Sequence, residues 1–223
     1  METLTLTSPI VMVVVGVPGS GKSYFAERFA DTFGAAIASP DRIRWMLFSK
    51  HTYSKTENEI VNQMNNLMIE QLLRTKRTFV IDGGFNRELD RRKLAAKARK
   101  AGYKMLVIVV QTDTATIRRR ALHRSENNPG DKYKQSLTPE QLAQFTERYE
   151  EPRADRDNVI VISGKHNYDA QARNVLKRIV ASGRAVPTTN AAGTTNVANA
   201  AARRASSTRP ARSINIDSHA DAK

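Results

Sequence analysis

A glycine-rich segment near the N-terminus has the composition and spacing of a phosphate-binding loop. Residues 16–23 read Gly-Val-Pro-Gly-Ser-Gly-Lys-Ser and follow an apolar run over residues 10–15. Glycines let backbone amides wrap around phosphate oxygens, the lysine of this motif reaches the β- and γ-phosphates, and the final hydroxyl can bind Mg²⁺. The segment predicts a nucleoside triphosphate site, with the binding residues Gly16, Pro18, Gly19, Ser20, Gly21, Lys22, Ser23 and Tyr24.

The residues after a later buried run favour phosphoryl transfer to a hydroxyl over hydrolysis. The run over residues 78–82 ends in Asp82, and Gly83 and Gly84 stand where a hydrolytic ATPase carries a glutamate beside its aspartate. The sequence also lacks the Asn-Lys-x-Asp element that reads guanine. We therefore expect ATP, with Mg²⁺, to donate a phosphoryl group to a bound substrate.

Asp41 and Arg44 follow the second expected strand, over residues 35–39. In parallel sheets ligands collect at the carboxyl ends of the strands, so this segment should lie beside the phosphate site. Asp41 could accept the proton of an acceptor hydroxyl, and Arg44 could hold an anionic group of the substrate. The alternative is that Asp41 caps a short helix and Arg44 faces solvent.

A cluster of arginines over residues 117–124 precedes a loop-like stretch over residues 125–137. Arg120 and Arg124 are four residues apart, so in a helix both can point the same way. Kinases need cations over the transferring phosphoryl group, and a basic helix that runs into a loop has the composition of a lid. The alternative for each single arginine is a solvated helical face.

The order of these motifs over residues 10–150 resembles the polynucleotide kinase branch of the P-loop kinases, although Asp-x-x-Arg and the lid arginines also fit zeta-toxin-type and antibiotic-modifying kinases. The resemblance implies that Asp41 is the general base and that the catalytic set is Lys22, Asp41, Arg120 and Arg124. It implies substrate contacts from Arg44, Asp82 and Arg91, and a metal site formed by Ser23 and Asp82. One departure concerns the substrate side, since Gly-Gly-Phe-Asn follows Asp82 where the family has a small residue and Thr-Asn.

Charge and composition exclude several other kinds of site. The 223 residues carry a formal net charge of +14, which attracts polyanions such as nucleic acid but names no function by itself. The chain has no cysteine, so disulfide scaffolds, cysteine-ligated metals and thiol nucleophiles are excluded. No apolar run reaches the length of a membrane span, so we expect a soluble, cytoplasmic protein without a membrane partner.

Apolar, β-branched runs alternate with segments of helical period from residue 10 to residue 181, a pattern typical of a parallel α/β sheet. We expect strands over residues 10–15, 35–39, 78–82, 104–110 and 159–162. Helices are expected over residues 22–33, 56–74, 87–101, 114–124, 139–150 and 170–181. Thr56 with Glu59, and Thr138 with Gln141, have the spacing of capping boxes at two helix starts.

The predicted fold is an α/β P-loop three-layer sandwich whose five-stranded parallel sheet has the order 2-3-1-4-5, with a helical lid. Residues 1–182 are expected to form this domain. Residues 183–223 contain mostly Ala, Thr, Asn, Ser and Arg, so we expect a disordered basic tail there. Such a tail is either a solubilising extension or a non-specific nucleic-acid arm.

Three functions remain open from the sequence, and the oligomeric state is not indicated. The favoured one is an ATP-dependent kinase of a nucleic-acid 5′-hydroxyl, since the segment over residues 87–101 is strongly basic. The second is a kinase of a small molecule such as a nucleotide sugar, an antibiotic or a sugar acid. The third is a non-catalytic protein that binds ATP and nucleic acid. Aromatic residues are only 6% of the chain, and none is interleaved with the basic runs as a base-stacking platform would be.

Overall fold

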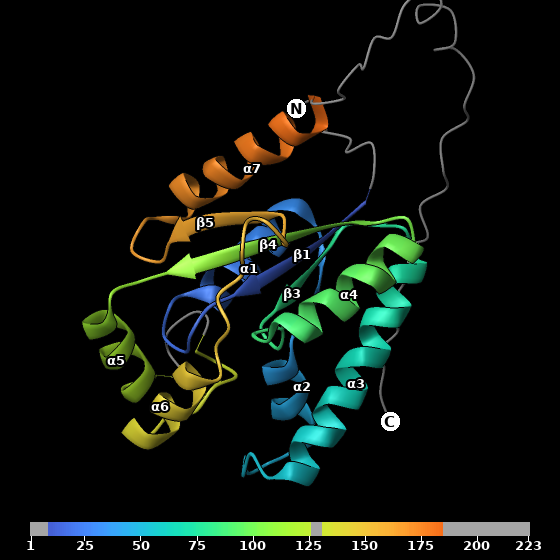
Figure 1. Ribbon diagram of the computed structural model, residues 1–223. Coiled ribbons are helices and arrows are strands. Elements are labelled where there is room, and N and C mark those ends of the chain that lie inside the picture. Colours follow the sequence, from blue (N-terminus) through green and yellow to red (C-terminus); the bar gives the residue numbers. More distant parts are fainter. Residues whose placement is uncertain (1–8, 126–130, 185–223) are drawn as a thin grey trace, which may run out of the picture. The chain divides into compact units, whose positions relative to one another are not determined.

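Five parallel strands form the central sheet of the structure (Figure 1). The computed structural model describes residues 9–125 and 131–184. The strands lie in the order β2-β3-β1-β4-β5 and are β1 (Ile10–Val15), β2 (Ala36–Ala38), β3 (Phe79–Asp82), β4 (Lys104–Gln111) and β5 (Val159–Ser163). Each neighbouring pair is parallel. The expected sheet and its order are confirmed.

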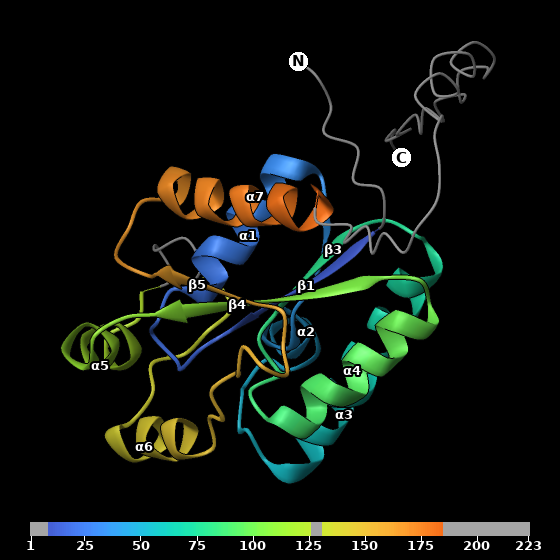
Figure 2. The ribbon, with the colours of Figure 1, turned by 45° about the horizontal axis from the view of Figure 1, so that its top comes forward.

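Helices cover both faces of this sheet (Figure 2). They are α1 (Lys22–Phe33), α2 (Pro40–Leu47), α3 (Lys55–Arg74), α4 (Glu88–Lys100), α5 (Thr114–Leu122), α6 (Pro139–Glu147) and α7 (Tyr168–Arg184). Met12 and Val14 of β1 belong to the core under α1 and α7, whereas Val11, Val13 and Val15 belong to the core under α3 and α4. Successive strand residues point to opposite faces, so a strand covered on both sides reads as an unbroken apolar run.

Helices α5 and α6 have a small core of their own, formed by Ala121, Leu137 and Leu142. The chain enters α5 from the last residue of β4, and it leaves α6 for the first residue of β5. Because few apolar residues hold this pair, it has the construction expected of a helical lid.

The prediction missed α2, which directly follows β2. Ser39 accepts a hydrogen bond from the Arg42 amide at 3.5 Å, and Pro40 takes the first helical position, both of which are start signals. Only Ile43 and Arg44 are buried in this short helix, so it has almost no apolar periodicity for a sequence pattern to reveal.

Several helix ends differ from the prediction. The expected capping box of Thr56 and Glu59 is wrong, because the helix begins earlier and Ser54 caps it by accepting from the Glu57 amide at 3.3 Å. Helix α5 ends at residue 122 and α6 at residue 147, each earlier than expected. The capping box at the start of α6, in which Thr138 and Gln141 bond each other's amides, is confirmed.

The expected boundary after residue 182 falls within α7, which continues to Arg184. The chain divides into a unit over residues 1–185 and a second over residues 186–223. The expected disordered basic tail, residues 183–223, lies outside the described residues except for the last two residues of α7. Among the helices that the structure describes, none combines the length and the apolar character that crossing a membrane requires.

Candidate active site

The phosphate-binding loop joins β1 to α1 at the carboxyl end of the sheet, as expected (Figure 1). Gly19 has a φ of 86°, and a Cβ atom there would lie 2.5 Å from the carbonyl oxygen of Ile117 in α5. Gly21 has a φ of 104° and forms the N-cap of α1 without any side-chain cap. Both conformations favour glycine. The amides of the first turn of α1 thus lack helical partners, an arrangement that binds phosphate oxygens.

The Lys22 side chain folds back over this loop and donates to the carbonyl oxygen of Val17 at 2.9 Å. Burial, and next the nearby ammonium of Lys134, lower the pKa of Lys22 to about 7; Asp82 and Asp41 oppose this shift. Two clustered ammonium groups are the electrostatic complement of a polyphosphate, which would stabilise both charges.

The register of the sheet places Asp82 beside the phosphate loop, which leads into Ser23 at the start of α1. Asp82, the last residue of β3, pairs with Val14, two residues before Gly16. Its carboxylate is 4% exposed, and its Oδ1 atom has no hydrogen-bond partner among the described residues. A hydroxyl and a carboxylate oxygen beside phosphate oxygens form a donor set that suits Mg²⁺, which uses one or two carboxylates plus phosphate and water. The residues present therefore fit the expected metal.

Asp41 lies in the first turn of α2, and its side chain is 36% exposed. The ammonium of Lys134 lies 3.6 Å from Asp41 Oδ2 and also donates to Ser23 Oγ. One amine therefore bridges the expected base and the expected metal ligand, and the structure brings Asp41 and the phosphate loop together.

Arg44 is buried, with an ion pair from its Nε atom to Glu57 Oε1 at 2.6 Å. Its other contacts are a hydrogen bond to Asn58, a 3.7 Å approach to Asp41 Oδ1, and the ring of Tyr53, whose centroid lies 4.6 Å from the guanidinium. Arg44 does not face solvent, so the alternative of a solvated side chain is wrong, whereas its contact with a substrate stays a prediction. We infer that it positions Asp41 and the loop before α3.

The two lid arginines flank the phosphate loop from different segments. Arg120 donates from Nη1 to the carbonyl oxygen of Gly164 at 3.1 Å, close to Gly21. Arg124 lies beyond the end of α5, where its Nη1 donates to the carbonyl oxygen of Gln135 at 2.9 Å. The expected helical spacing of the pair is therefore absent. Arg124 nevertheless lies near enough to Lys22 to help lower its pKa.

Arg91 is buried and its guanidinium contacts groups of the protein itself. It is 1% exposed and donates from Nη1 to three carbonyl oxygens, those of Phe85, Asn86 and Glu150, at 3.0–3.3 Å. Its Nε atom lies 3.4 Å from Asp157 Oδ2. These contacts differ from the expected substrate contact, and we infer that Arg91 positions the loop after Asp82.

Sequence reasoning missed Lys134 and did not predict the packing of Gly164 on the phosphate loop. Lys134 stands in the loop before α6 with no spacing that marks it, and only folding brings it to Ser23. Gly164 follows β5, and a Cβ atom there would overlap the Ser20 carbonyl oxygen and the Thr112 hydroxyl. Thr112 donates to that same carbonyl oxygen at 2.9 Å. The loops after β4 and β5 therefore pack directly on the phosphate loop.

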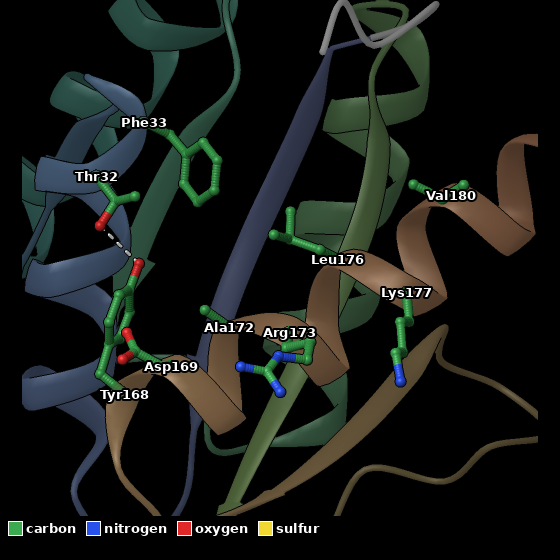
Figure 3. A pocket seen from close by; sticks show the side chains of 9 residues that line it. All are labelled: Thr32, Phe33, Tyr168, Asp169, Ala172, Arg173, Leu176, Lys177 and Val180. Atoms are coloured by element: carbon green, nitrogen blue, oxygen red, sulfur yellow. Dashed lines mark hydrogen bonds between the residues drawn. The ribbon is translucent and has the colours of Figure 1, made fainter. Parts of the chain in front are cut away.

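A groove between α1 and α7 lies apart from this site (Figure 3). Phe33, Ala172 and Leu176 line it, with Arg173 and Lys177 at its edge, and its volume is about 720 Å³. Phe33 ends α1, whereas the phosphate loop precedes the start of that helix. None of the expected site residues lines the groove.

Comparison with protein families connects this geometry to known proteins. The family described as AAA domain matches residues 11–152, which span the phosphate loop, α2, Asp82 and both lid arginines. The chain belongs to the AAA domain family. This AAA domain has a kinase-like P-loop fold. No curated protein sequence matches the chain.

Solved structures share the fold of this AAA domain at low sequence identity. A candidate kinase from Chloroflexus aurantiacus has a TM-score of 0.61 and 15% identity, covering 77% of this chain and 99% of its own. Kti12 of Chaetomium thermophilum, solved with ADP-AlF3, has a TM-score of 0.58 and 19% identity, with coverages of 77% and 97%. A gluconokinase from Sinorhizobium meliloti 1021 has a TM-score of 0.55 and 19% identity, with coverages of 78% and 94%. At these identities the likeness shows the fold alone.

Proposed function

We propose that this protein is an ATP-dependent phosphotransferase that moves the γ-phosphoryl group of ATP to a substrate hydroxyl, most favourably the 5′-hydroxyl of a nucleic acid. The observation that carries the proposal is the place of Asp41. The same ammonium contacts Ser23 and lies 3.6 Å from this carboxylate. This proximity to the phosphate loop supports Asp41 as the base for an acceptor hydroxyl that meets the γ-phosphate.

Each residue of the site has a role in this reaction. Asp41 accepts the proton while the acceptor oxygen bonds to the γ-phosphorus and the bond to the bridging oxygen of ADP breaks. Lys22, Arg120 and Arg124 stabilise the negative charge of the transferring group. Mg²⁺, held by Ser23 and Asp82, would supply charge neutralisation at the β- and γ-phosphates.

An aromatic pair beside Asp41 supports a nucleic-acid acceptor. Trp45 of α2 is 49% exposed and meets the ring of Tyr133 edge-on, with 5.4 Å between the ring centroids. The Arg42 guanidinium lies 5.0 Å from the Tyr133 centroid. Every nucleobase has a π face, so the exposed Trp45 ring, with the half-buried Tyr133 ring and an arginine nearby, suits the end of a single strand. Folding creates this platform from two segments far apart in sequence.

The basic helix α4 gives less support than its composition suggests. Three of its exposed basic residues, Lys97, Arg99 and Lys100, lie in its last turn. That turn adjoins the start of β4 and therefore the end of the sheet opposite the phosphate loop. Lys97 also pairs with Glu70 at 3.0 Å. Cations in a last turn offset the helix dipole, which explains this cluster without a ligand.

A small-molecule acceptor is the second candidate. The gluconokinase from Sinorhizobium meliloti 1021 and a sugar kinase from Janibacter sp. HTCC2649, the latter with a TM-score of 0.56, share the fold over 78% of this chain. The site is compatible with such acceptors because Asp41 needs only a hydroxyl.

The test is transfer of labelled γ-phosphate from ATP with Mg²⁺ to matched oligonucleotides that carry a 5′-hydroxyl or a 5′-phosphate, as DNA and as RNA. We expect label on the 5′-hydroxyl strands only, with Asp41→Asn reducing the rate on the order of 10²-fold while ATP still binds. Asp31→Asn, which changes an exposed carboxylate of α1, is the control.

The other outcomes separate the alternatives. Label absent from every strand but present on gluconate or other sugars would replace the nucleic-acid acceptor by a small molecule. ATP binding without any turnover that depends on Asp41 would indicate a non-catalytic ATP-binding protein.

A further inference from the structure

A lysine outside the phosphate-binding motif contacts Ser23, the hydroxyl that is expected to bind the metal. The Lys134 ammonium donates to Ser23 Oγ and lies 3.6 Å from Asp41 Oδ2, and its side chain is 13% exposed. The residue belongs to the connection between α5 and α6, more than a hundred positions from the loop that it contacts. None of the roles assigned to the other residues of the site uses this charge.

Neighbouring contacts hold Lys134 in this place. The adjacent Tyr133 ring packs against Trp45 and lies 5.0 Å from the Arg42 guanidinium. Arg42 in turn forms an ion pair with Glu27 of α1 at 2.9 Å. The contacts of Tyr133 therefore hold this part of the α5–α6 connection against α2, the helix that carries Asp41. The ion pair of Arg42 links the same contacts to α1.

The position has a clear electrostatic consequence. Lys134 contacts Ser23, the residue next to Lys22, so two ammonium side chains belong to the same site. A Mg²⁺ ion on Ser23 Oγ and an ammonium on the same atom would repel each other strongly at such separation. With the metal on Ser23 Oγ, the flexible lysine side chain would leave that atom, and the terminal phosphate would offer it an acceptor in addition to Asp41.

We propose that Lys134 is a further substrate-binding residue of this site, an ammonium that the α5–α6 connection supplies to the γ-phosphate of ATP. The proposal rests on the ATP site of the proposed function but not on the identity of the acceptor. It predicts that Lys134 discriminates nucleoside triphosphates from diphosphates, which have no γ-phosphate.

The test is calorimetric binding of Mg²⁺ with a non-hydrolysable ATP analogue and of Mg²⁺ with ADP to the full chain. We expect Lys134→Ala to weaken the triphosphate about 10-fold, the size of one charge-assisted hydrogen bond, and to change ADP affinity less than about 2-fold. Lys134→Arg should restore most of the loss. The control is Lys132→Ala, which removes the same charge from the same connection but contacts the Tyr133 ring instead.

Several outcomes would overturn the proposal. An equal loss of affinity for both nucleotides, or no loss for either, would show that Lys134 does not select the γ-phosphate. Tighter binding of both would show that it blocks the metal side instead. If Lys134→Ala does not fold, Lys134→Gln keeps most of the side-chain length. It is then tested by the same comparison of the loss of triphosphate affinity with the loss of ADP affinity.

The two proposals fail in distinguishable ways. A wild-type chain that binds neither nucleotide removes the ATP site and with it both proposals. A wild-type chain that binds the triphosphate through Lys134 but labels no acceptor supports the lysine and contradicts only the transfer reaction.

Discussion

Arg44 of α2 and Glu57 of α3 form a buried ion pair, with 2.6 Å between Nε and Oε1. The other carboxylate oxygen, Glu57 Oε2, accepts hydrogen bonds from the amides of Thr52 and Tyr53 and from the Thr52 hydroxyl at 2.7–3.0 Å. Both charges are thus desolvated and fully engaged. The pair fixes the loop between α2 and α3, and it holds α2, the helix that carries Asp41, in position against α3.

Replacing Glu57 by glutamine should lower the free energy of unfolding by about 1–3 kcal/mol at neutral pH, because the buried guanidinium loses its counter-charge. Urea denaturation monitored by circular dichroism measures the difference. Glu59→Gln is the matched control, since Glu59 is 59% exposed and only 4.0 Å from Lys55, and it should change stability by less than about 0.5 kcal/mol.

The same pair predicts a pH dependence. Burial raises the pKa of Glu57, but hydrogen bonds from Thr52 and Arg44 and the Arg44 charge outweigh it and hold the pKa at about 2, below the ordinary 4.5. A carboxyl with a lowered folded pKa stabilises above its unfolded pKa and loses that contribution as pH falls toward the folded value. The stability difference between wild type and Glu57→Gln should therefore shrink between about pH 4.5 and about pH 2. A constant difference across this window would contradict the assignment.

Arg91→Lys should destabilise the protein by about 3 kcal/mol, because an ammonium cannot reach three carbonyl oxygens and Asp157 at once. Thermal and urea unfolding measure this loss, with the exposed Arg92→Lys as control. Unchanged stability together with a raised KM for the acceptor would instead give Arg91 the substrate contact that the family resemblance implies.

Gly164→Ala should weaken ATP binding on the order of 10-fold, because a methyl group there would overlap the Ser20 carbonyl oxygen and push the loop after β5 away from the phosphate loop. Titration calorimetry measures the affinity. Thr112→Val, which removes the hydrogen bond to Ser20 but keeps the shape, should lose less, and Thr112→Ser should bind as wild type does. Full affinity in Gly164→Ala would show that the two loops separate at no cost.

The salt dependence of transfer should distinguish a polymer from a small acceptor. A single strand held through about three phosphates should show a KM that rises with roughly the second power of salt concentration. A monovalent sugar acid should show at most about the first power. Initial rates between about 50 and about 200 mM salt measure the slope. A shallow slope with an oligonucleotide would mean that the aromatic pair, and not the backbone charge, dominates its binding.

The sequence by itself determined the sheet and the phosphate loop. Alternating apolar and helical segments specified five parallel strands, because strands buried on both faces read as unbroken apolar runs. The order of the strands, which the structure confirms, was expected from the P-loop fold and not from the periodicity. The phosphate loop could also be predicted from the sequence, because Gly19 and Gly21 adopt conformations that favour glycine and stand at a fixed spacing from Lys22. Such features depend on neighbours in sequence.

Only the tertiary structure decided what the charged residues do. Arg44 and Arg91 have the same side chain as the exposed Arg92, yet both are buried and form ion pairs, Arg44 with Glu57 and Arg91 with Asp157. Lys134 stands in a loop with no motif and reaches Ser23 only when α5 and α6 fold beside the sheet. A charge acquires its partner, and therefore its role, from long-range contacts that leave no periodicity in the sequence.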